Sequence, residues 1–355
     1  MAERVHGGLD ARELERHGID ASAVLDLSVN VNPRGPHPAV VDAVVRAAAD
    51  ALADYPDRQA TRARRTLAGA LDCEPERIAL GHGSVELLWS LIAGLRGAGG
   101  PLLIVGPTFG EPEAAARAHG VACARVELDA RDAFAPDPTR VAAAIAEHAP
   151  CAVYLCQPNN PTGRAFGSSQ LQALIDAHPR ALFLLDQAFL SLSSEHAQLA
   201  LRLDRKPNVV LIRSLTKDHA LAGLRAGYAL AAPEWIARIE AQRPPWTVSS
   251  LAQAAVIAAA QHPEHVREAR ECLLDARQQL SAALGAAGFE ALPSDTHFLL
   301  IKTHDADALR ERLLVRHRVL VRSCRSFGLP HHLRIAAGDT AARARLLAAL
   351  AEEAP

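Results

Sequence analysis

The chain has 355 residues, of which 49% are hydrophobic, and its formal net charge is −2. This composition predicts a globular protein of one large or two ordinary domains, and it excludes the strongly basic surface that binds nucleic acids or anionic membranes. Its apolar runs are far shorter than the roughly 20 residues that cross a bilayer, and its first residues lack the basic-then-apolar order of a secretory signal. We therefore expect a cytoplasmic protein with a small-molecule substrate and no nucleic-acid or membrane partner.

The first 40 residues cannot form one regular element, because Pro33, Gly35, Pro36 and Pro38 interrupt them. We predict that residues 1–40 are an N-terminal arm and lead-in that packs with a smaller C-terminal domain. Short β-rich runs then alternate with helical patterns over residues 41–245, which predicts a large, doubly wound α/β domain with a mainly parallel sheet. The expected strands are Ile78–Leu80, Leu102–Val105, Ala152–Cys156, Leu182–Leu185, Val209–Ile212 and Tyr228–Leu230.

A domain boundary is predicted near residue 245. A helix is expected to begin at Pro233 and to stop before the Pro-Pro pair at 244–245, and a long Ala-rich helical segment follows from about Ser250 to Ala286. Residues 246–355 are predicted to form a small α+β domain. Its expected strands are Phe298–Lys302, Val319–Arg322 and Leu333–Ala336.

Lysine is rare in this chain, since only Lys206, Lys217 and Lys302 stand among 38 basic residues. Lys217 closes a Ser-Leu-Thr-Lys motif, and Arg225 follows it eight residues later. A lysine amine can lose its proton and attack a carbonyl to form a Schiff base, whereas a guanidinium cannot. Lys217 is therefore the first candidate for covalent chemistry, although most single lysines are surface charges.

Three polar loops follow predicted strands, where ligands bind in open α/β sheets. Asp186 ends an apolar strand, which suits either a helix N-cap or the partner of a protonated pyridine nitrogen. The loop around Asn160 reads Pro-Asn-Asn-Pro-Thr-Gly and by itself predicts a plain turn. The loop from Gly81 to Glu86 places small residues before an apolar helix, whose free N–H groups can bind a phosphate.

Together and in this order, these motifs resemble the aspartate-aminotransferase fold family of pyridoxal-phosphate enzymes (fold type I), and the resemblance covers almost the whole chain. It implies a large, doubly wound, mainly parallel seven-stranded sheet domain plus a small α+β domain, with pyridoxal 5′-phosphate as cofactor. Lys217 would bind the cofactor covalently and carry protons. Asp186 would pair with the pyridine nitrogen, Asn160 would donate to the phenolic oxygen, and Phe109 would stack on the ring.

The resemblance also implies a phosphate site and a second subunit. The cofactor phosphate would be bound by Gly83, Ser84, Val85, Ser214 and Arg225. Tyr55 would reach the site from the partner in a homodimer. Phe189 stands beside the cofactor where aminotransferases often have a tyrosine, and its missing hydroxyl favours decarboxylation or another specialised reaction.

Two branches of the family compete, and both take phosphorylated amino compounds. The His-Gly-Gly start at His6, the stretch 25–36 and the Pro-Trp pair at Trp246 are similar to L-threonine-O-3-phosphate decarboxylase of cobalamin biosynthesis. Histidinol-phosphate aminotransferase shares the Tyr-Pro-Asp and Pro-Asn-Asn-Pro-Thr-Gly motifs. The substrate contacts carried over from the family are His6, Ser28, Asn32, Asn160, Arg322 and Arg334, with Arg334 on the substrate carboxylate.

The sequence thus predicts decarboxylation of L-threonine phosphate to 1-amino-2-propanol phosphate. The alternative is an aminotransferase acting on histidinol phosphate or on an amino acid of specialised metabolism. The Ser-x-x-Lys spacing of Ser214 and Lys217 also occurs in acyl-transferring enzymes. The partner motifs of those enzymes are absent from this sequence, which argues against that activity. A non-catalytic module that keeps the fold would be expected to have lost the lysine or gained a DNA-binding segment. None of the 16 histidines falls in a metal-ligand spacing, so no metal is expected.

Overall fold

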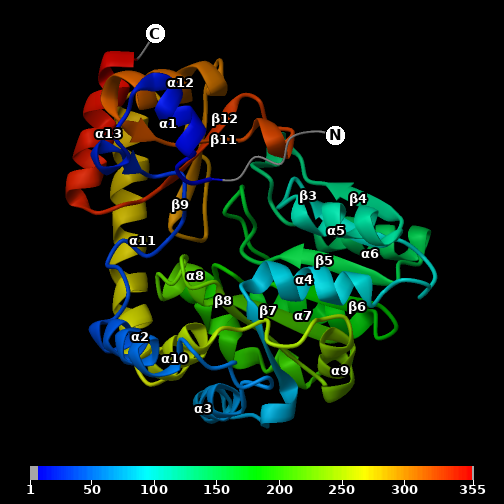
Figure 1. Ribbon diagram of the computed structural model, residues 1–355. Helices are drawn as coiled ribbons and strands as arrows, with labels where there is room; N and C mark the ends of the chain where they lie inside the picture. The colour runs from blue at the N-terminus through cyan, green and yellow to red at the C-terminus, as the bar shows by residue number, and fades with distance from the viewer. Residues whose placement is uncertain (1–6, 354–355) are drawn as a thin grey trace.

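The apolar runs of the central part of the chain form one seven-stranded sheet in the computed structural model, which describes residues 7–353 (Figure 1). The strands are β2 Ile78–His82, β3 Leu102–Gly106, β4 Cys123–Glu127, β5 Ala152–Cys156, β6 Leu182–Asp186, β7 Val209–Ser214 and β8 Ala226–Ala231. Their order is β2-β8-β7-β6-β5-β3-β4, and β8 alone runs antiparallel to its neighbours. The predicted mainly parallel sheet is confirmed.

Helices cover both faces of this sheet because its strands are apolar on both sides. The helices of this part of the chain are α2 Pro38–Ala51, α3 Thr61–Leu71, α4 Ser84–Ala93, α5 Glu111–His119, α6 Pro138–His148, α7 Ser168–Ala177, α8 Leu215–Asp218, α9 Pro233–Ala241 and α10 Ser250–Ala260. In β6, Phe183 and Leu185 pack on the side of α7 and α10, while Leu182 and Leu184 pack on the side of α4 and α9. This alternation is the two-residue period of a strand buried on both faces.

A second, smaller sheet lies beyond the large one and is reached through the long helix α11 Pro263–Ala286 (Figure 1). It has the order β11-β12-β9 and is antiparallel, and helices α12 and α13 pack with α11 around a common apolar core. The remaining bounds are β9 Phe298–Lys302, β10 Val319–Leu320, β11 Arg322–Ser323, β12 His332–Ala336, α12 Ala306–His317 and α13 Thr340–Glu353. These elements have the predicted α+β character.

Two predicted elements had wrong bounds, and one strand was not predicted. The helix expected over Ser250–Ala286 is two helices, because Pro263 lacks an N–H and starts the new helix α11. The strand expected over Val319–Arg322 is also two, since β10 pairs with β1 while β11 pairs with β12. The edge strand β4 was not predicted, because most of its side chains face water and its sequence carries no apolar run.

The described part of the N-terminal segment packs on the smaller sheet. Helix α1 Ala11–His17 begins at Asp10, whose carboxylate accepts two backbone N–H groups, and Leu14 packs against Leu314 and Leu320. Strand β1 Leu25–Asp26 pairs with β10 in parallel. The boundary at residue 245 stays a prediction, and α10 beyond it packs against α2 and α3. No helix within residues 7–353 is long and apolar enough to cross a membrane.

Candidate active site

The polar residues predicted at the ends of three strands lie at one edge of the large sheet. Strands β5, β6 and β7 are parallel neighbours, and their register places Cys156 beside Asp186 and Asp186 beside Ile212. The loop of Asn160 follows β5, and α8 with Lys217 follows β7. Parallel pairing therefore brings Asn160, Asp186 and Lys217 to the same carboxyl edge.

The amine of Lys217 has an unusual protonation equilibrium. Burial, together with the nearby guanidiniums of Arg334 and Arg225, lowers its pKa to about 8, and the carboxylate of Asp186 opposes this shift. A lysine with this pKa carries far more neutral amine near neutral pH than an exposed lysine does. Neutral amine is the form that attacks a carbonyl carbon.

Asp186 is a buried carboxyl group held by two hydrogen bonds. The Tyr154 hydroxyl donates to Oδ2 at 3.0 Å, and the backbone N–H of Ala188 donates to Oδ1 at 3.1 Å. Burial raises the pKa of Asp186, while these hydrogen bonds and Lys217 oppose the rise. A protonated heteroaromatic nitrogen placed here would stabilise the carboxylate, so the site fits a pyridine ring.

An anion cradle lies at the start of α4. Gly83 is its N-cap with φ of 78° and gives no side-chain cap, so the N–H groups of the first turn are available to a ligand. A Cβ on Gly83 would lie 2.6 Å from Nη2 of Arg225, and a Cβ on Gly227 would lie 2.5 Å from the N of Ser84. Ser214 is the register partner of Gly227 and is buried, and its hydroxyl lies 2.6 Å from that of Thr216. A guanidinium, a helix terminus and hydroxyls suit a phosphate group.

Arg322 and Arg334 form a second cationic centre on the smaller sheet. They are register partners across β11 and β12, and each is only 5% exposed. Arg334 donates from Nη1 to Oδ1 of Asn160 and from Nη2 to the Ser28 carbonyl, and burial lowers its pKa to about 10. Arg322 donates from Nη2 to the Ser326 hydroxyl at 2.7 Å. Two buried guanidiniums side by side favour an anionic group of a ligand.

Residues 28–32, here named the strap, contact both Arg334 and the backbone of Lys217. The N–H of Asn32 donates to the Lys217 carbonyl at 2.9 Å, and its amide Nδ2 donates to the Asp218 carbonyl at 3.0 Å. Ser28 donates to Asp26 at 2.6 Å and accepts from the Gly8 N–H at 2.8 Å. Lys217 and Arg334 are thus held through one short segment.

Asn30, in the middle of the strap, is the site residue that the sequence analysis passed over. Its side chain is 1% exposed, and neither its amide oxygen nor its amide nitrogen has a hydrogen-bond partner in the described structure. An unpaired buried amide costs about 1–3 kcal/mol. A ligand that pairs with this amide would recover that cost, so Asn30 is a candidate substrate contact.

Comparisons with known proteins agree with this geometry. The family model of class I and II aminotransferases matches residues 22–350. The chain belongs to this family. Histidinol-phosphate aminotransferase of Symbiobacterium thermophilum is 32% identical over 340 residues, which is 96% of this chain and 91% of the relative.

Two solved structures of the family resemble this aminotransferase-family chain closely. Histidinol-phosphate aminotransferase of Sinorhizobium meliloti, in complex with pyridoxal 5′-phosphate, superposes with a TM-score of 0.87 at 27% identity, covering 97% of this chain and 94% of the other. L-threonine-O-3-phosphate decarboxylase of Porphyromonas gingivalis superposes with a TM-score of 0.78 at 25% identity, covering 92% and 98%. The resemblance and the fold inferred from the sequence are confirmed.

Four further residues were predicted to contact the cofactor or the substrate: Phe109, Phe189, Tyr55 and His6. Phe109 is half-buried in the loop after β3, and Phe189 is buried 5.1 Å from the Phe298 ring. Tyr55 is 81% exposed and its ring lies 4.8 Å from that of Trp246. His6 lies outside the described residues. The assigned roles of these four residues in ligand binding stay predictions.

Tyr154 is a further residue that the sequence analysis missed, although a tyrosine within the apolar run of β5 was a signal. Replacing it by phenylalanine removes the hydroxyl that donates to Asp186. A hydrogen bond to a charged group contributes about 1.5–3 kcal/mol. We therefore expect Tyr154→Phe to weaken binding of pyridoxal 5′-phosphate about tenfold or more, measured by fluorescence titration of the cofactor-free protein. Equal affinity in the two proteins would show that the hydroxyl does not support the Asp186 carboxylate.

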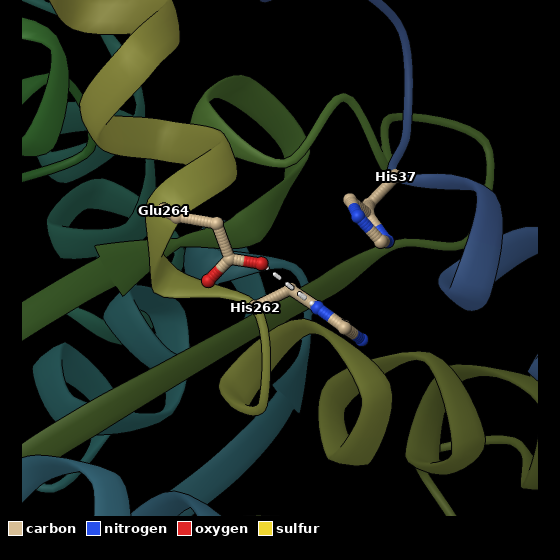
Figure 2. Close-up of side chains that lie close together, drawn as sticks. All are labelled: His37, His262 and Glu264. Carbon is tan, nitrogen blue, oxygen red and sulfur yellow. Dashed lines mark hydrogen bonds and ion pairs between the residues drawn. The ribbon is translucent and has the colours of Figure 1, made fainter.

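Within residues 7–353, folding brings three potential metal ligands together, His37, His262 and Glu264 (Figure 2). The two imidazoles stack with centroids 4.0 Å apart and planes 16° apart, so their lone pairs lie in two separate, nearly parallel planes, an arrangement that does not favour one shared ion. His37 Nδ1 also caps α2 by accepting from the Ala39 N–H, and His262 Nδ1 lies 2.9 Å from Glu264. These contacts fit helix capping, and we assign no metal to them.

Proposed function

We propose that this chain is a pyridoxal-phosphate-dependent aminotransferase whose substrate is a phosphorylated amino compound of the histidinol phosphate type. One observation carries the proposal. The Lys217 amine lies close enough to two guanidiniums for their positive charges to lower its pKa. They are Arg225 at the α4 cradle and Arg334 of the second cationic centre. One centre would bind the cofactor phosphate and the other the anionic end of the substrate, so the reactive amine would lie between them. The similar curated proteins carry the name histidinol-phosphate aminotransferase, which supports the same function.

When bound, pyridoxal 5′-phosphate supplies an electron sink for the bonds at the substrate Cα. The chain itself would supply orientation and proton transfer. Asp186 would hold a positive charge on the ring nitrogen, and Arg334 would orient the substrate through its anionic group. Lys217, as neutral amine, would take the proton from the substrate Cα and deliver it to the former aldehyde carbon of the cofactor. In this proposal, orientation by the second cationic centre decides which bond at Cα is cleaved.

A matched assay tests the proposal. Purified protein would be incubated with histidinol phosphate plus 2-oxoglutarate and, separately, with L-threonine phosphate, and both glutamate and CO₂ would be measured. Glutamate formed from histidinol phosphate without CO₂ is the expected result. CO₂ from L-threonine phosphate without glutamate would overturn it, as would the absence of both products at saturating cofactor.

Decarboxylation of L-threonine phosphate, the function first predicted from the sequence, is the second candidate and has less support from the relatives. The position of the N-terminal arm favours it. A Cβ on Gly7 would lie 2.5 Å from the Ser28 carbonyl and 3.4 Å from Nη2 of Arg334. Gly7, of the His-Gly-Gly motif, thus lies beside the second cationic centre. Phe189, which offers no hydroxyl to a cofactor, also favours this candidate.

Homodimer formation, with Tyr55 acting in the partner's site, is part of the proposal. Tyr55 is exposed and Val41, Val45 and Leu52 are also exposed on or beside α2, which is expected of an uncovered interface. Mixed dimers test this sharply. Lys217→Ala and Tyr55→Ala chains, each impaired alone, should regain activity on mixing, because the heterodimer contains one site with both residues. No recovery in a verified heterodimer would place Tyr55 in its own subunit's site or outside any site.

A further inference from the structure

His297 lies buried beside the proposed site and makes a directional contact with the strap. It stands directly before β9, is 1% exposed, and its Nε2 lies 3.1 Å from the Asn30 carbonyl oxygen. A carbonyl can only accept, so Nε2 must carry the hydrogen. The other nitrogen, Nδ1, lies 3.1 Å from the Thr296 hydroxyl and accepts from it. Both contacts are satisfied by one neutral tautomer.

The surroundings hold this imidazole in place. The Phe189 ring lies 6.0 Å from it and the Phe298 ring 5.7 Å. The His297 carbonyl accepts from the Ala337 N–H at 2.9 Å, just beyond the end of the strand that carries Arg334. Burial, with the positive charges of Lys217 and Arg334, lowers the pKa of His297 to about 4, while hydrogen bonding to the backbone of Asn30 and of Leu192 opposes the shift. The ring therefore donates to the strap without adding a third charge near two cations.

We propose that His297 is a positioning residue, which fixes the strap through the Asn30 carbonyl and so presents the Asn30 amide to the substrate. The strap is held at three positions: Arg334 donates to the carbonyl of Ser28, His297 to that of Asn30, and the backbone of Asn32 donates to the Lys217 carbonyl. The middle anchor is the one next to the unpaired amide. This inference rests on the proposed function, because it assigns the specificity of that same site.

Two substitutions separate the hydrogen bond from the packing. His297→Phe keeps a ring of similar size but removes the donor, whereas His297→Gln keeps a donor that can reach the Asn30 carbonyl. Losing this donor leaves the buried Asn30 carbonyl unpaired, so we expect His297→Phe to raise the KM for the amino substrate on the order of tenfold. We expect little change in kcat and in cofactor affinity, and His297→Gln should restore most of the lost KM.

A second readout does not depend on turnover. Hydrogen exchange at residues 28–32 should be faster in His297→Phe than in wild type and near normal in His297→Gln. Unchanged exchange and unchanged KM in a folded His297→Phe protein would overturn the inference, as would an equal defect in both variants. Failure of wild type to turn over any phosphorylated amino compound would instead overturn the proposed function, and exchange would still test His297.

A double-mutant cycle covers the case in which His297→Phe folds poorly. Asn30→Ala and His297→Asn, whose shorter amide should not reach the Asn30 carbonyl, would be made singly and together, with His297→Gln as the control that keeps the donor. If His297 acts through Asn30, the KM effects of His297→Asn and Asn30→Ala should be strongly non-additive. Additive effects would show that the two residues act independently and would overturn the inference.

Discussion

Lys217→Ala is expected to lower kcat by at least about a thousandfold, because it removes both the nucleophile and the proton carrier of the site. It should also abolish the visible absorbance band of the lysine-bound cofactor. Lys302→Ala is the matched control, since Lys302 is exposed, at 3.6 Å from Glu290. Steady-state assays and absorbance spectra of both variants give the comparison. Retained turnover in Lys217→Ala would contradict the assignment.

The protonation of Lys217 adds a pH dependence. Its pKa is lowered to about 8 from 10.5, so the neutral, reactive amine increases as the pH rises through 8 and then levels off. In the cofactor-free protein, the rate of pyridoxal phosphate capture is therefore expected to rise with a midpoint near pH 8, measured by stopped-flow absorbance. A midpoint near the ordinary lysine value would show that burial and the two arginines do not act on this amine.

Arg334→Gln is the second substitution with a large expected effect. It removes one of two buried guanidiniums, and the loss of one partner from a buried charged contact costs about 2–5 kcal/mol. We expect kcat/KM for the phosphorylated substrate to fall by about two orders of magnitude or more, mainly through KM, with the cofactor band preserved. Arg325→Gln is the control, because Arg325 is exposed in the turn between β11 and β12. It should leave KM unchanged.

The opposite outcome for this pair would be informative. If Arg334→Gln lost cofactor but kept substrate affinity, the smaller sheet would contribute to the cofactor site instead of the substrate site. If Arg325→Gln shared the KM defect, the effect would come from disturbing the hairpin that carries Arg322.

The parts predictable from sequence are those encoded by local pattern. Apolar runs ending in polar loops predicted six strands of the large sheet, and because parallel strands share an edge, Asn160, Asp186 and Lys217 could be grouped beforehand. The edge strand β4 could not be predicted, since its mostly water-facing side chains leave no apolar pattern. The break at Pro263 was predictable, because proline favours the first turn of a helix.

The residues that were missed depend on contacts distant in sequence. Tyr154 gains its role only because β5 and β6 pair in a register that brings its hydroxyl to Asp186. His297 contacts a carbonyl 267 positions away. Asn30 and Asn32 look equivalent in sequence. The side-chain amide of Asn32 donates to the backbone of α8, whereas the Asn30 amide is unpaired in the described structure. Tertiary packing alone distinguishes them.

The central claim is that Lys217 is the residue that binds the cofactor covalently. Its most direct test is borohydride reduction of the protein loaded with pyridoxal 5′-phosphate, followed by proteolysis and mass spectrometry of the peptides. The account predicts one stoichiometric pyridoxyl adduct, on Lys217. An adduct on Lys206 or Lys302 in place of Lys217, or no adduct in folded and loaded protein, would contradict it.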